Sequence, residues 1–494
     1  MFEYAESDPT IPHAQARNII EQLRTRLLKA QYQLLENRDR ALLVLVGGID
    51  GAGKGDTVNL LNDWMDARHI HTIAFDAPTK DEQAYPPMYR FWRALPACGE
   101  IGIVFGSGYA PLLREAAKKK PDADLLEHMV LAARRYEADL VANGVQVIKL
   151  WFHLSRKAQH ARIKQLLANP STAWKVSTQD QDVHKQFKRV RQAAQRVIQA
   201  TDANHSPWII IPAADEDLRN IHTGQAVLAA LQKKRVRVPL LHDPAVLPTF
   251  KRQHNPLHEL DYTAQLSNED YDTELLHWQN RLARLVRQEK FLRNHALMIV
   301  FEGSDAAGKG GAIRRVTQAV DARQYEIMPV AAPKRFELDR PYLWRFWRHV
   351  PRLGRLAIFD RSWYGRVLVE RVEKLIPTAT WKRAYAEING FEHQLSQHGV
   401  IVVKFWLAIT PEEQLKRFKE RQAHPFKRYK LTDEDWRNRK RWRDYETAAA
   451  DMIVHTSSAQ APWHLVSAND KRHARVEVIK HLVKCIEQSI EHDD

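Results

Sequence analysis

The sequence contains only two cysteines, Cys98 and Cys485, among its 494 residues. Two cysteines cannot build a disulfide framework, so a disulfide-rich secreted protein is excluded and a reducing, cytoplasmic setting is expected. No run of about 18 apolar residues occurs, so the sequence predicts no membrane-spanning helix and no membrane partner. The first eight residues also lack the basic and apolar regions of a secretory signal.

Acidic residues are fewer than basic ones, which leaves a formal net charge of +15 at pH 7. This surplus indicates an anionic substrate or partner, but it does not distinguish nucleic acid, a phospholipid surface and a small polyanion. The chain is too long for one ordinary hydrophobic core, so two or three domains are expected.

A glycine-rich segment occurs twice. Residues 41–55 reappear as residues 296–310, and the offset between Lys54 and Lys309, 309 − 54, is 255 residues. The same offset relates Arg-Phe-Trp-Arg at 90 to Arg-Phe-Trp-Arg at 345. A constant register of this kind indicates two copies of one fold.

The two copies define the expected domains. We predict one domain from 14 to 235 and another from 268 to 490, joined by the proline-rich linker 236–267. In each copy, apolar strands alternate with helical patterns, as at 101–105 and 356–359. The alternation predicts an α/β fold with a parallel sheet covered by helices on both faces.

Residues 303–310, Gly-Ser-Asp-Ala-Ala-Gly-Lys-Gly, have the spacing of a P-loop between a strand and a helix. In such a loop the backbone amides cradle phosphate oxygens and the lysine reaches the transferred group. Gly310 replaces the usual Mg²⁺-binding hydroxyl, so we expect the loop acid Asp305 and a second carboxylate to hold the metal. The loop's predicted phosphate-binding residues are Gly303, Ala306, Ala307, Gly308, Lys309, Gly310 and Gly311.

Asp360 supplies the second carboxylate. It ends an apolar strand, at the edge where open α/β sheets place ligands, so Asp305 and Asp360 are predicted to bind Mg²⁺. Arg361 follows and is expected to bind phosphate or to stabilise transition-state charge. The first copy has Phe105 and Gly106 at these two positions.

A cation-rich segment follows in the second copy. Arg417, Lys427 and Arg428 are predicted to bind phosphate, and Arg421 is the candidate for catalysis. At the positions of Arg421, Lys427 and Arg428 the first copy has Leu166, Thr172 and Ala173. The first domain is therefore predicted to be degenerate and inactive, and the second to be catalytic.

The loop at 302–311, Trp-Arg-Phe-Trp-Arg at 344–348 and Phe-Asp-Arg-Ser-Trp-Tyr-Gly-Arg at 359–366 together resemble family-2 polyphosphate kinases of the fused, two-domain class. The resemblance implies thymidylate-kinase-like, three-layer α/β/α domains with helical lids. It also implies phosphoryl transfer from inorganic polyphosphate to AMP, giving ADP. The family's catalytic residues map onto Asp305, Lys309, Asp360, Arg361 and a lid arginine, first of all Arg421.

The expected chemistry is an in-line displacement by a phosphate oxygen of AMP. That phosphate has a second pKa of about 6 and is largely ionised at neutral pH, so no general base is required. Alignment and charge neutralisation would supply the catalysis. Other nucleoside monophosphates could serve as acceptors.

Three alternatives stay open. An ATP-dependent nucleotide kinase shares the fold, although Gly310 argues against it. A nucleic-acid-binding P-loop protein would explain the charge, but no helix-turn-helix spacing, zinc-ligand cluster or RNP-like string supports a nucleic-acid partner. The first copy could instead be a regulatory or dimerising module. The sequence does not decide the acceptor base, the chain-length preference, the direction of the reaction or whether a homo-oligomer forms.

Overall fold

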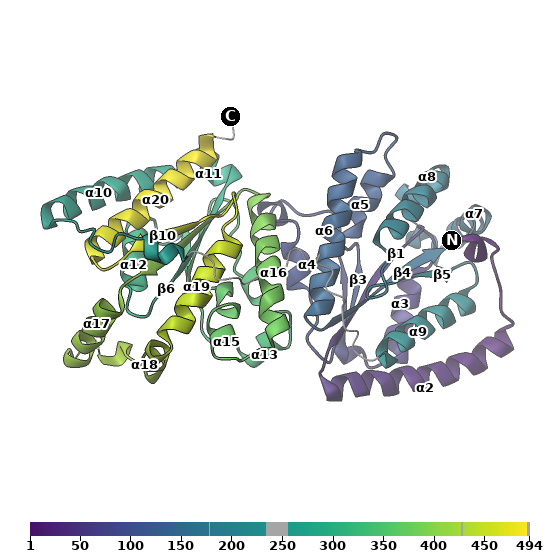
Figure 1. Ribbon diagram of the computed structural model, residues 1–494. Coiled ribbons are helices and arrows are strands. Elements are labelled where there is room, and N and C mark those ends of the chain that lie inside the picture. The colour runs from purple at the N-terminus through teal and green to yellow at the C-terminus, as the bar shows by residue number, and fades with distance from the viewer. Residues whose placement is uncertain (177, 234–254, 426–427, 492–494) are drawn as a thin grey trace. The chain divides into compact units, whose positions relative to one another are not determined.

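The structure is a computed structural model that describes residues 1–176, 178–233, 255–425 and 428–491 (Figure 1). Residues 236–254 of the predicted linker lie outside the described residues. Lys427, a predicted phosphate ligand, also lies outside them. The chain forms two compact units. The first comprises Met1–Pro78, Arg90–Leu241 and Pro333–Trp344, and the second comprises Thr79–Tyr89, His242–Ala332 and Arg345–Asp494.

The first unit contains a five-stranded sheet in the order β2-β3-β1-β4-β5, and all of its paired strands are parallel. Six of the eight residues of β1 are buried, as expected of a central strand covered on both faces. The strands are β1 (Ala41–Gly48), β2 (Ile70–Ala74), β3 (Ile101–Phe105), β4 (Val145–His153) and β5 (Trp208–Pro212).

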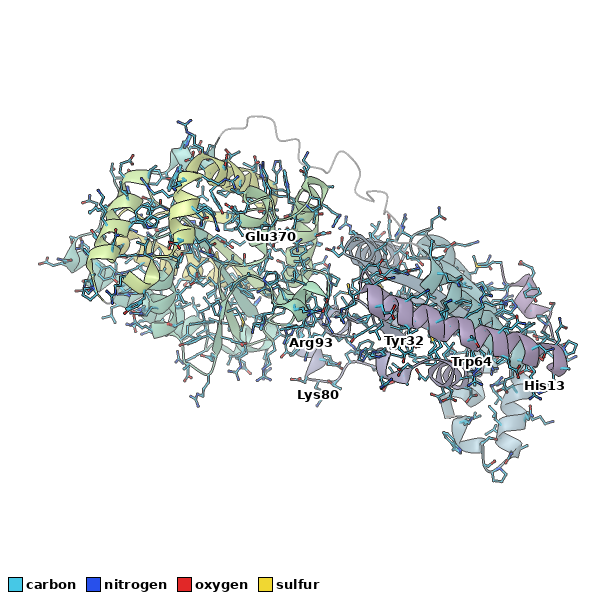
Figure 2. All side chains as sticks on the ribbon, turned by 90° about the horizontal axis from the view of Figure 1, so that it is seen from below. His13, Tyr32, Trp64, Lys80, Arg93 and Glu370 are labelled. Carbon is cyan, nitrogen blue, oxygen red and sulfur yellow. The ribbon has the colours of Figure 1, made fainter. Side chains whose placement is uncertain are left out.

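Helices cover both faces of this sheet (Figure 1). One face carries α2 (His13–Asn37), α3 (Lys54–Trp64) and α9 (Glu216–Gln232), and the other carries α5 (Tyr109–Ala116), α6 (Ala123–Ala142) and α8 (Thr178–Thr201). Figure 2 shows α2 along its length, with His13 at its start and Tyr32 further along. The remaining helices are α1 (Glu3–Glu6), α4 (Tyr89–Arg93) and α7 (Arg156–Ala168).

The second unit repeats this arrangement with the order β10-β9-β6-β8-β7, again with parallel pairs. Its central strand β6 (Ala296–Gly303) is buried over seven residues and leads into the glycine-rich loop. The other strands are β7 (Tyr325–Pro329), β8 (Leu356–Asp360), β9 (Val400–Ala408) and β10 (Trp463–Ser467).

The helices of the second unit also form two layers (Figure 1). On one face lie α10 (Asn268–Leu285), α12 (Lys309–Ala319) and α20 (Lys471–Glu491), whose apolar side chains join β6 and β9 in one core. On the other face lie α16 (Thr378–Ser396) and α19 (Trp442–Thr456). The remaining helices of this unit are α11 (Glu289–Asn294), α15 (Val369–Val372), α17 (Pro411–Ala423) and α18 (Asp433–Lys440). Helix α13 (Arg335–Leu338) belongs to the first unit, in its segment Pro333–Trp344, and α14 (Trp344–Trp347) begins at the last residue of that segment.

Both units therefore confirm the predicted α/β class and its parallel sheets. In the two sheets, β1 lies between β3 and β4, and β6 lies between β8 and β9. Each glycine-rich loop is therefore beside the carboxyl ends of two neighbouring strands, where doubly wound folds bind ligands. Among the described helices, none is both long enough and apolar enough to cross a lipid bilayer.

Candidate active site

The phosphate loop of the second unit joins β6 to α12. Gly303 has a φ of 140°, and a Cβ atom there would lie 2.2 Å from the carbonyl oxygen of Leu407, so only glycine fits. Gly308 caps the start of α12 in a left-handed conformation. Lys309 Nζ donates to the carbonyl oxygens of Gly303 and Ser304, at 2.8 and 3.3 Å. The lysine side chain therefore lies across the loop.

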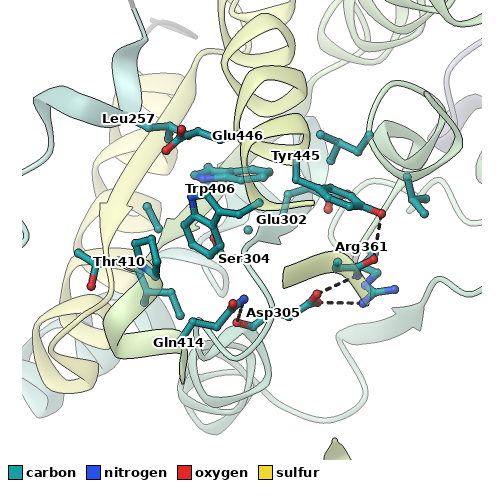
Figure 3. A pocket seen from close by; sticks show the side chains of 18 of the residues that line it. Leu257, Glu302, Ser304, Asp305, Arg361, Trp406, Thr410, Gln414, Tyr445 and Glu446 are labelled. Carbon is teal, nitrogen blue, oxygen red and sulfur yellow. Dashed lines mark hydrogen bonds and ion pairs between the residues drawn. The ribbon is translucent and has the colours of Figure 1, made fainter. Parts of the chain in front are cut away.

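The loop acid Asp305 contacts two residues from different elements (Figure 3). Arg361 Nη2 lies 3.3 Å from Asp305 Oδ1, and Asn438 Nδ2 on α18 donates to Asp305 Oδ2 at 2.9 Å. Gln414 Nε2 on α17 donates to the backbone carbonyl of Asp305 at 3.1 Å. Asp305 and Arg361, two separately predicted site residues, are thus adjacent, and α17 and α18 provide the other contacts of Asp305.

Asp360 pairs with Phe301 in the register of β8 and β6, so this residue lies beside the end of the strand that leads into the loop. Arg361 follows with a φ of 64°. Burial opposes the charge of the Arg361 guanidinium, but Asp305, Glu302, Glu434 and Asp360 together raise its pKa. Arg361 therefore stays cationic beside these four acidic residues.

A second buried acid, Glu302, lies immediately before the loop. It is 5% exposed, and its Oε1 accepts a hydrogen bond from Ser362 Oγ at 2.9 Å. Burial raises the pKa of Glu302, while Lys309, the Ser362 hydrogen bond and Arg361 act in the opposite direction. Sequence reasoning missed this residue, although the offset of 255 places Gly47 at its position in the first unit.

The predicted lid cations have different surroundings. Arg417 is 3% exposed, and its guanidinium donates to the backbone carbonyls of Ala306, Ala307, Ala468 and Asn469. Arg417 therefore holds the loop in place in this structure and does not present free donors to phosphate, which differs from its predicted role. Arg428 Nη2 donates to Tyr429 OH at 3.0 Å, beyond either cavity described below.

An aromatic cavity of about 290 Å³ opens above the loop. Its floor is formed by Glu302, Gly303, Ser304 and Asp305, and Arg361 lies at its side (Figure 3). Most other walls are apolar, with contributions from β9, α15, α19 and residues 257–262, which sequence analysis assigned to the linker. These apolar walls include Leu257, Leu368, Val369, Trp406, Trp442 and Tyr445.

A basic cavity of about 240 Å³ lies against a different part of the same loop. It is lined by Ala306, Ala307 and Gly308 together with the start of α12. Its charged side chains are Arg417, Glu420, Arg421, Lys471 and Arg475. Arg421 thus lines this cavity together with the loop. Lys471 and Arg475 do so as well, and sequence reasoning missed them although the first copy has Glu216 and Asn220 at these positions.

The acidic residues around the loop fit a divalent cation that also contacts bound phosphates. Asp305, Asp360 and Glu302 bring carboxylate oxygens to one sheet edge, and hard cations prefer oxygen ligands. Within the described ranges, no three His, Cys, Asp or Glu side chains are grouped as a complete metal site. A cation here would therefore share its ligands with substrate phosphates, as Mg²⁺ commonly does.

The first unit has the same loop without these partners. Lys54 Nζ donates to the carbonyl oxygens of Gly48 and Ile49, at 2.9 and 3.1 Å, as in the second unit. The side chain of Asp50 is 55% exposed and pairs with Lys54, whereas that of Asp305 is 13% exposed and pairs with Arg361. The glycine at position 106 explains the difference, because it cannot supply the guanidinium of Arg361.

An arginine side chain lies beside this loop, at the position that corresponds to the basic cavity. The buried Arg219 stands at the position of Ala474, and a Cβ atom on Gly53 would lie 2.8 Å from its guanidinium. Arg219 Nε donates to Thr57 Oγ1 at 2.7 Å. The guanidinium therefore fills space that is open in the second unit.

A parallel α/β sheet with a glycine-rich loop at the start of a helix is typical of phosphate-binding proteins. Residues 11–239 and 265–494 each match the model of the polyphosphate kinase 2 (PPK2) family. The chain belongs to this family, with two copies of its domain. A crystal structure assigned to polyphosphate kinase 2 from Pseudomonas aeruginosa PA01 covers 100% of both chains with a TM-score of 0.88 and 44% identity.

Curated relatives match over the same length. The polyphosphate:AMP phosphotransferase of Pseudomonas syringae pv. tomato is 45% identical over 496 residues, which cover 100% of this chain and 99% of the relative. The polyphosphate:AMP phosphotransferase of Acinetobacter johnsonii is 41% identical over 473 residues, covering 94% of this chain and 95% of the relative.

Proposed function

We propose that this chain transfers the terminal phosphoryl group of inorganic polyphosphate to AMP and so produces ADP. The observation that carries the proposal is the pair of cavities on one phosphate loop, one aromatic and one lined by arginine and lysine. A nucleoside suits the first and a polyanion suits the second. The names of the full-length relatives support the same donor and acceptor, and favour polyphosphate over ATP as the donor.

The reaction is an in-line displacement. An ionised phosphate oxygen of AMP forms a bond to the terminal phosphorus, and the bond to the bridging oxygen breaks, which leaves polyphosphate one unit shorter. Lys309 and the loop amides hold the phosphates, and Arg361 stabilises the charge that develops between them. We assign Asp305 and Asp360 as ligands of Mg²⁺, which would neutralise phosphate charge when bound.

We further propose a single active site, in the domain from 268 to 490. The domain from 14 to 235 lacks Glu302, Asp360 and Arg361, which are replaced by Gly47, Phe105 and Gly106. Arg219 also fills the space beside its loop. We place the reaction in the cytoplasm, where AMP is available.

The test is an incubation of the full chain with Mg²⁺, AMP and polyphosphate in the absence of ATP. We expect ADP to accumulate, as measured by chromatography, while the polyphosphate becomes shorter. Omitting Mg²⁺ or adding a chelator should stop the reaction. No ADP under these conditions, with ADP formed when ATP replaces polyphosphate, would establish the ATP-dependent nucleotide kinase instead.

A further inference from the structure

The two units hold the same tryptophan in different surroundings. Trp151 on β4 and Trp406 on β9 are related by the offset of 255 residues. Trp151 Nε1 donates to His153 Nδ1 at 3.2 Å. In the second unit the position of the histidine is taken by Ala408, and Trp406 Nε1 has no hydrogen-bond partner among the described residues.

The unpaired donor of Trp406 requires an explanation, because Trp406 is only 7% exposed. Buried N–H groups in proteins are almost always paired, and an unpaired one destabilises the folded state. Trp406 lines the aromatic cavity and stands at its centre in Figure 3. A ligand in that cavity is therefore the natural source of the missing acceptor.

The corresponding space in the first unit is filled by protein. The rings of Phe2 and His153 stack with their centroids 4.0 Å apart and an interplanar angle of 11°. His153 Nε2 lies 3.0 Å from Glu6 Oε1, and Arg191 Nη2 donates to Glu6 Oε2 at 3.0 Å. The polar atoms of His153, Glu6 and Arg191 are therefore paired with one another, and Phe2 packs against His153.

In the second unit the side chains at the positions of Phe2 and His153 are smaller. Leu257 replaces Phe2 and Ala408 replaces His153, so both rings of the stack are missing. Leu257, Ala408 and Glu446, the counterpart of Arg191, all line the aromatic cavity. Two aromatic side chains that stack in the first unit are thus absent from the wall of this cavity.

The wall that carries Leu257 is fixed to the rest of the unit. His258 Nε2 lies 3.5 Å from Glu446 Oε1, and Tyr262 OH donates to the carbonyl oxygen of Leu257 at 3.1 Å. Asn469 Nδ2 donates to the carbonyl oxygen of Tyr262 at 3.2 Å. Residues 257–262 thus belong to the cavity and do more than connect the two repeats.

The chemistry of the cavity suits a flat, largely apolar ring with a few polar atoms. Trp442, Leu368 and Val369 present apolar surface that would be unfavourable for a chain of phosphates. The floor, at Ser304 and Asp305, is the phosphate loop itself. A nucleotide could therefore place its base among the apolar walls and its phosphate at the loop.

We propose that this cavity binds the base of the acceptor nucleotide and that Trp406 Nε1–H donates a hydrogen bond to a ring nitrogen or carbonyl oxygen of that base. Leu257 and Ala408 determine specificity by leaving room for the base. The proposal rests on the function proposed above, because it takes a nucleoside monophosphate as the acceptor.

The test uses the full chain and the variants Trp406→Phe, Ala408→His and Leu257→Phe. Steady-state rates give the KM for AMP and the KM for polyphosphate, and calorimetry gives the affinity for AMP and for ribose 5-phosphate, which has no base. Trp151→Phe is the matched control, because it removes the same N–H from the first unit. Thermal unfolding midpoints report whether each variant is folded.

We expect Trp406→Phe to raise the KM and Kd for AMP about 3- to 10-fold, because the variant loses one buried hydrogen bond to the base. The KM for polyphosphate and the affinity for ribose 5-phosphate should stay unchanged, as should every value for Trp151→Phe. Ala408→His and Leu257→Phe should abolish measurable AMP binding with ribose 5-phosphate still bound.

Two results would overturn the base site. One is an equal loss of affinity for AMP and ribose 5-phosphate in folded Trp406→Phe, and the other is wild-type AMP binding in both cavity-filling variants. The chain could bind AMP in the expected base-dependent pattern and yet make no ADP from polyphosphate. That result would reject only polyphosphate as the phosphoryl donor and would leave the base site standing.

Discussion

Lys404 Nζ lies 2.7 Å from Glu392 Oε2, and the exposed fractions of the two side chains are 0% and 2%. The same lysine donates to Tyr364 OH at 2.9 Å and to the carbonyl oxygen of Thr456 at 2.7 Å. Every donor of this buried ammonium is therefore used, which is the condition under which a buried charge is tolerated.

The first unit contains the same network. Lys149 Nζ lies 2.7 Å from Glu137 Oε2, with exposed fractions of 0% and 2%, and it also contacts Tyr109 OH and the carbonyl oxygen of Thr201. The first repeat has thus kept the polar network of its interior while it lost the acids and the arginine of the site. The selective loss supports a domain that still folds but no longer catalyses.

We predict that Lys404→Met and Lys149→Met destabilise their own units equally, by about 3–5 kcal/mol, because each leaves a buried glutamate unpaired. Urea unfolding followed by circular dichroism, with one transition for each unit, measures the change. The exposed Lys29→Met serves as a control and should change stability by less than about 0.5 kcal/mol. A much smaller effect of Lys149→Met than of Lys404→Met would show that the first unit no longer depends on this network.

Catalysis should depend on the second unit alone. Asp360→Asn should reduce turnover by about 100-fold or more, because charge stabilisation at the transferred phosphoryl group is usually the largest catalytic contribution. The thermal unfolding midpoint should stay unchanged. Lys54→Ala in the first loop is the comparison variant, and it should leave turnover as it is. A large fall in turnover with folded Lys54→Ala would contradict the single-site proposal.

The repeat itself explains how much of this site the sequence could predict. Comparing the copies at one offset pointed to Asp360, Arg361 and Arg421, because each has a non-polar or small counterpart in the first copy. The same comparison gave no role to Ala408. Its meaning depends on the indole two residues earlier on β9 and on the stacking of Phe2 against His153, which only the folded chain shows.

Arg417 shows the opposite limitation. The sequence shows that position 417 is a cation in the predicted lid segment. It does not show whether the guanidinium contacts phosphate or backbone carbonyls. The structure places its guanidinium against four carbonyl oxygens around the loop. Burial of 97% of this side chain could not be inferred from a segment as rich in charge as 417–430.

The basic cavity gives a prediction about the donor. Arg475→Ala should raise the KM for polyphosphate with little change in the KM for AMP, because one cation facing a polyanion is removed. The dependence of that KM on salt should also weaken, since electrostatic attraction is screened. Arg293→Ala removes an exposed arginine from α11, before the start of β6, and should change neither constant. An increase confined to the KM for AMP would place the donor elsewhere.

Acid should destabilise the second unit through His481. Burial, and to a smaller extent repulsion from His464, lowers the pKa of His481 from 6.5 to about 4. The unfolded chain therefore binds the proton first, so the stability contributed by neutral His481 is complete above pH 6.5 and is lost as the pH falls towards 4. His481→Phe cannot titrate and should flatten the decline of the second unit's unfolding midpoint across this range. An identical decline in the variant would assign the acid sensitivity to other groups.

Gly106 shows why the first domain cannot easily regain an active site. It has the same backbone conformation as Arg361, with φ of 62° against 64°, but a Cβ atom at Gly106 would lie 2.0 Å from the carbonyl oxygen of Phe75. We therefore predict that Gly106→Ala lowers the stability of the first unit by about 1–3 kcal/mol, since both the contact and the conformation disfavour a side chain. Gly55→Ala, where a Cβ atom meets nothing within 4 Å, should be neutral or stabilising. Thermal unfolding of both variants decides the matter: equal midpoints would mean that the loop at 106 adapts, and an arginine could then be restored there.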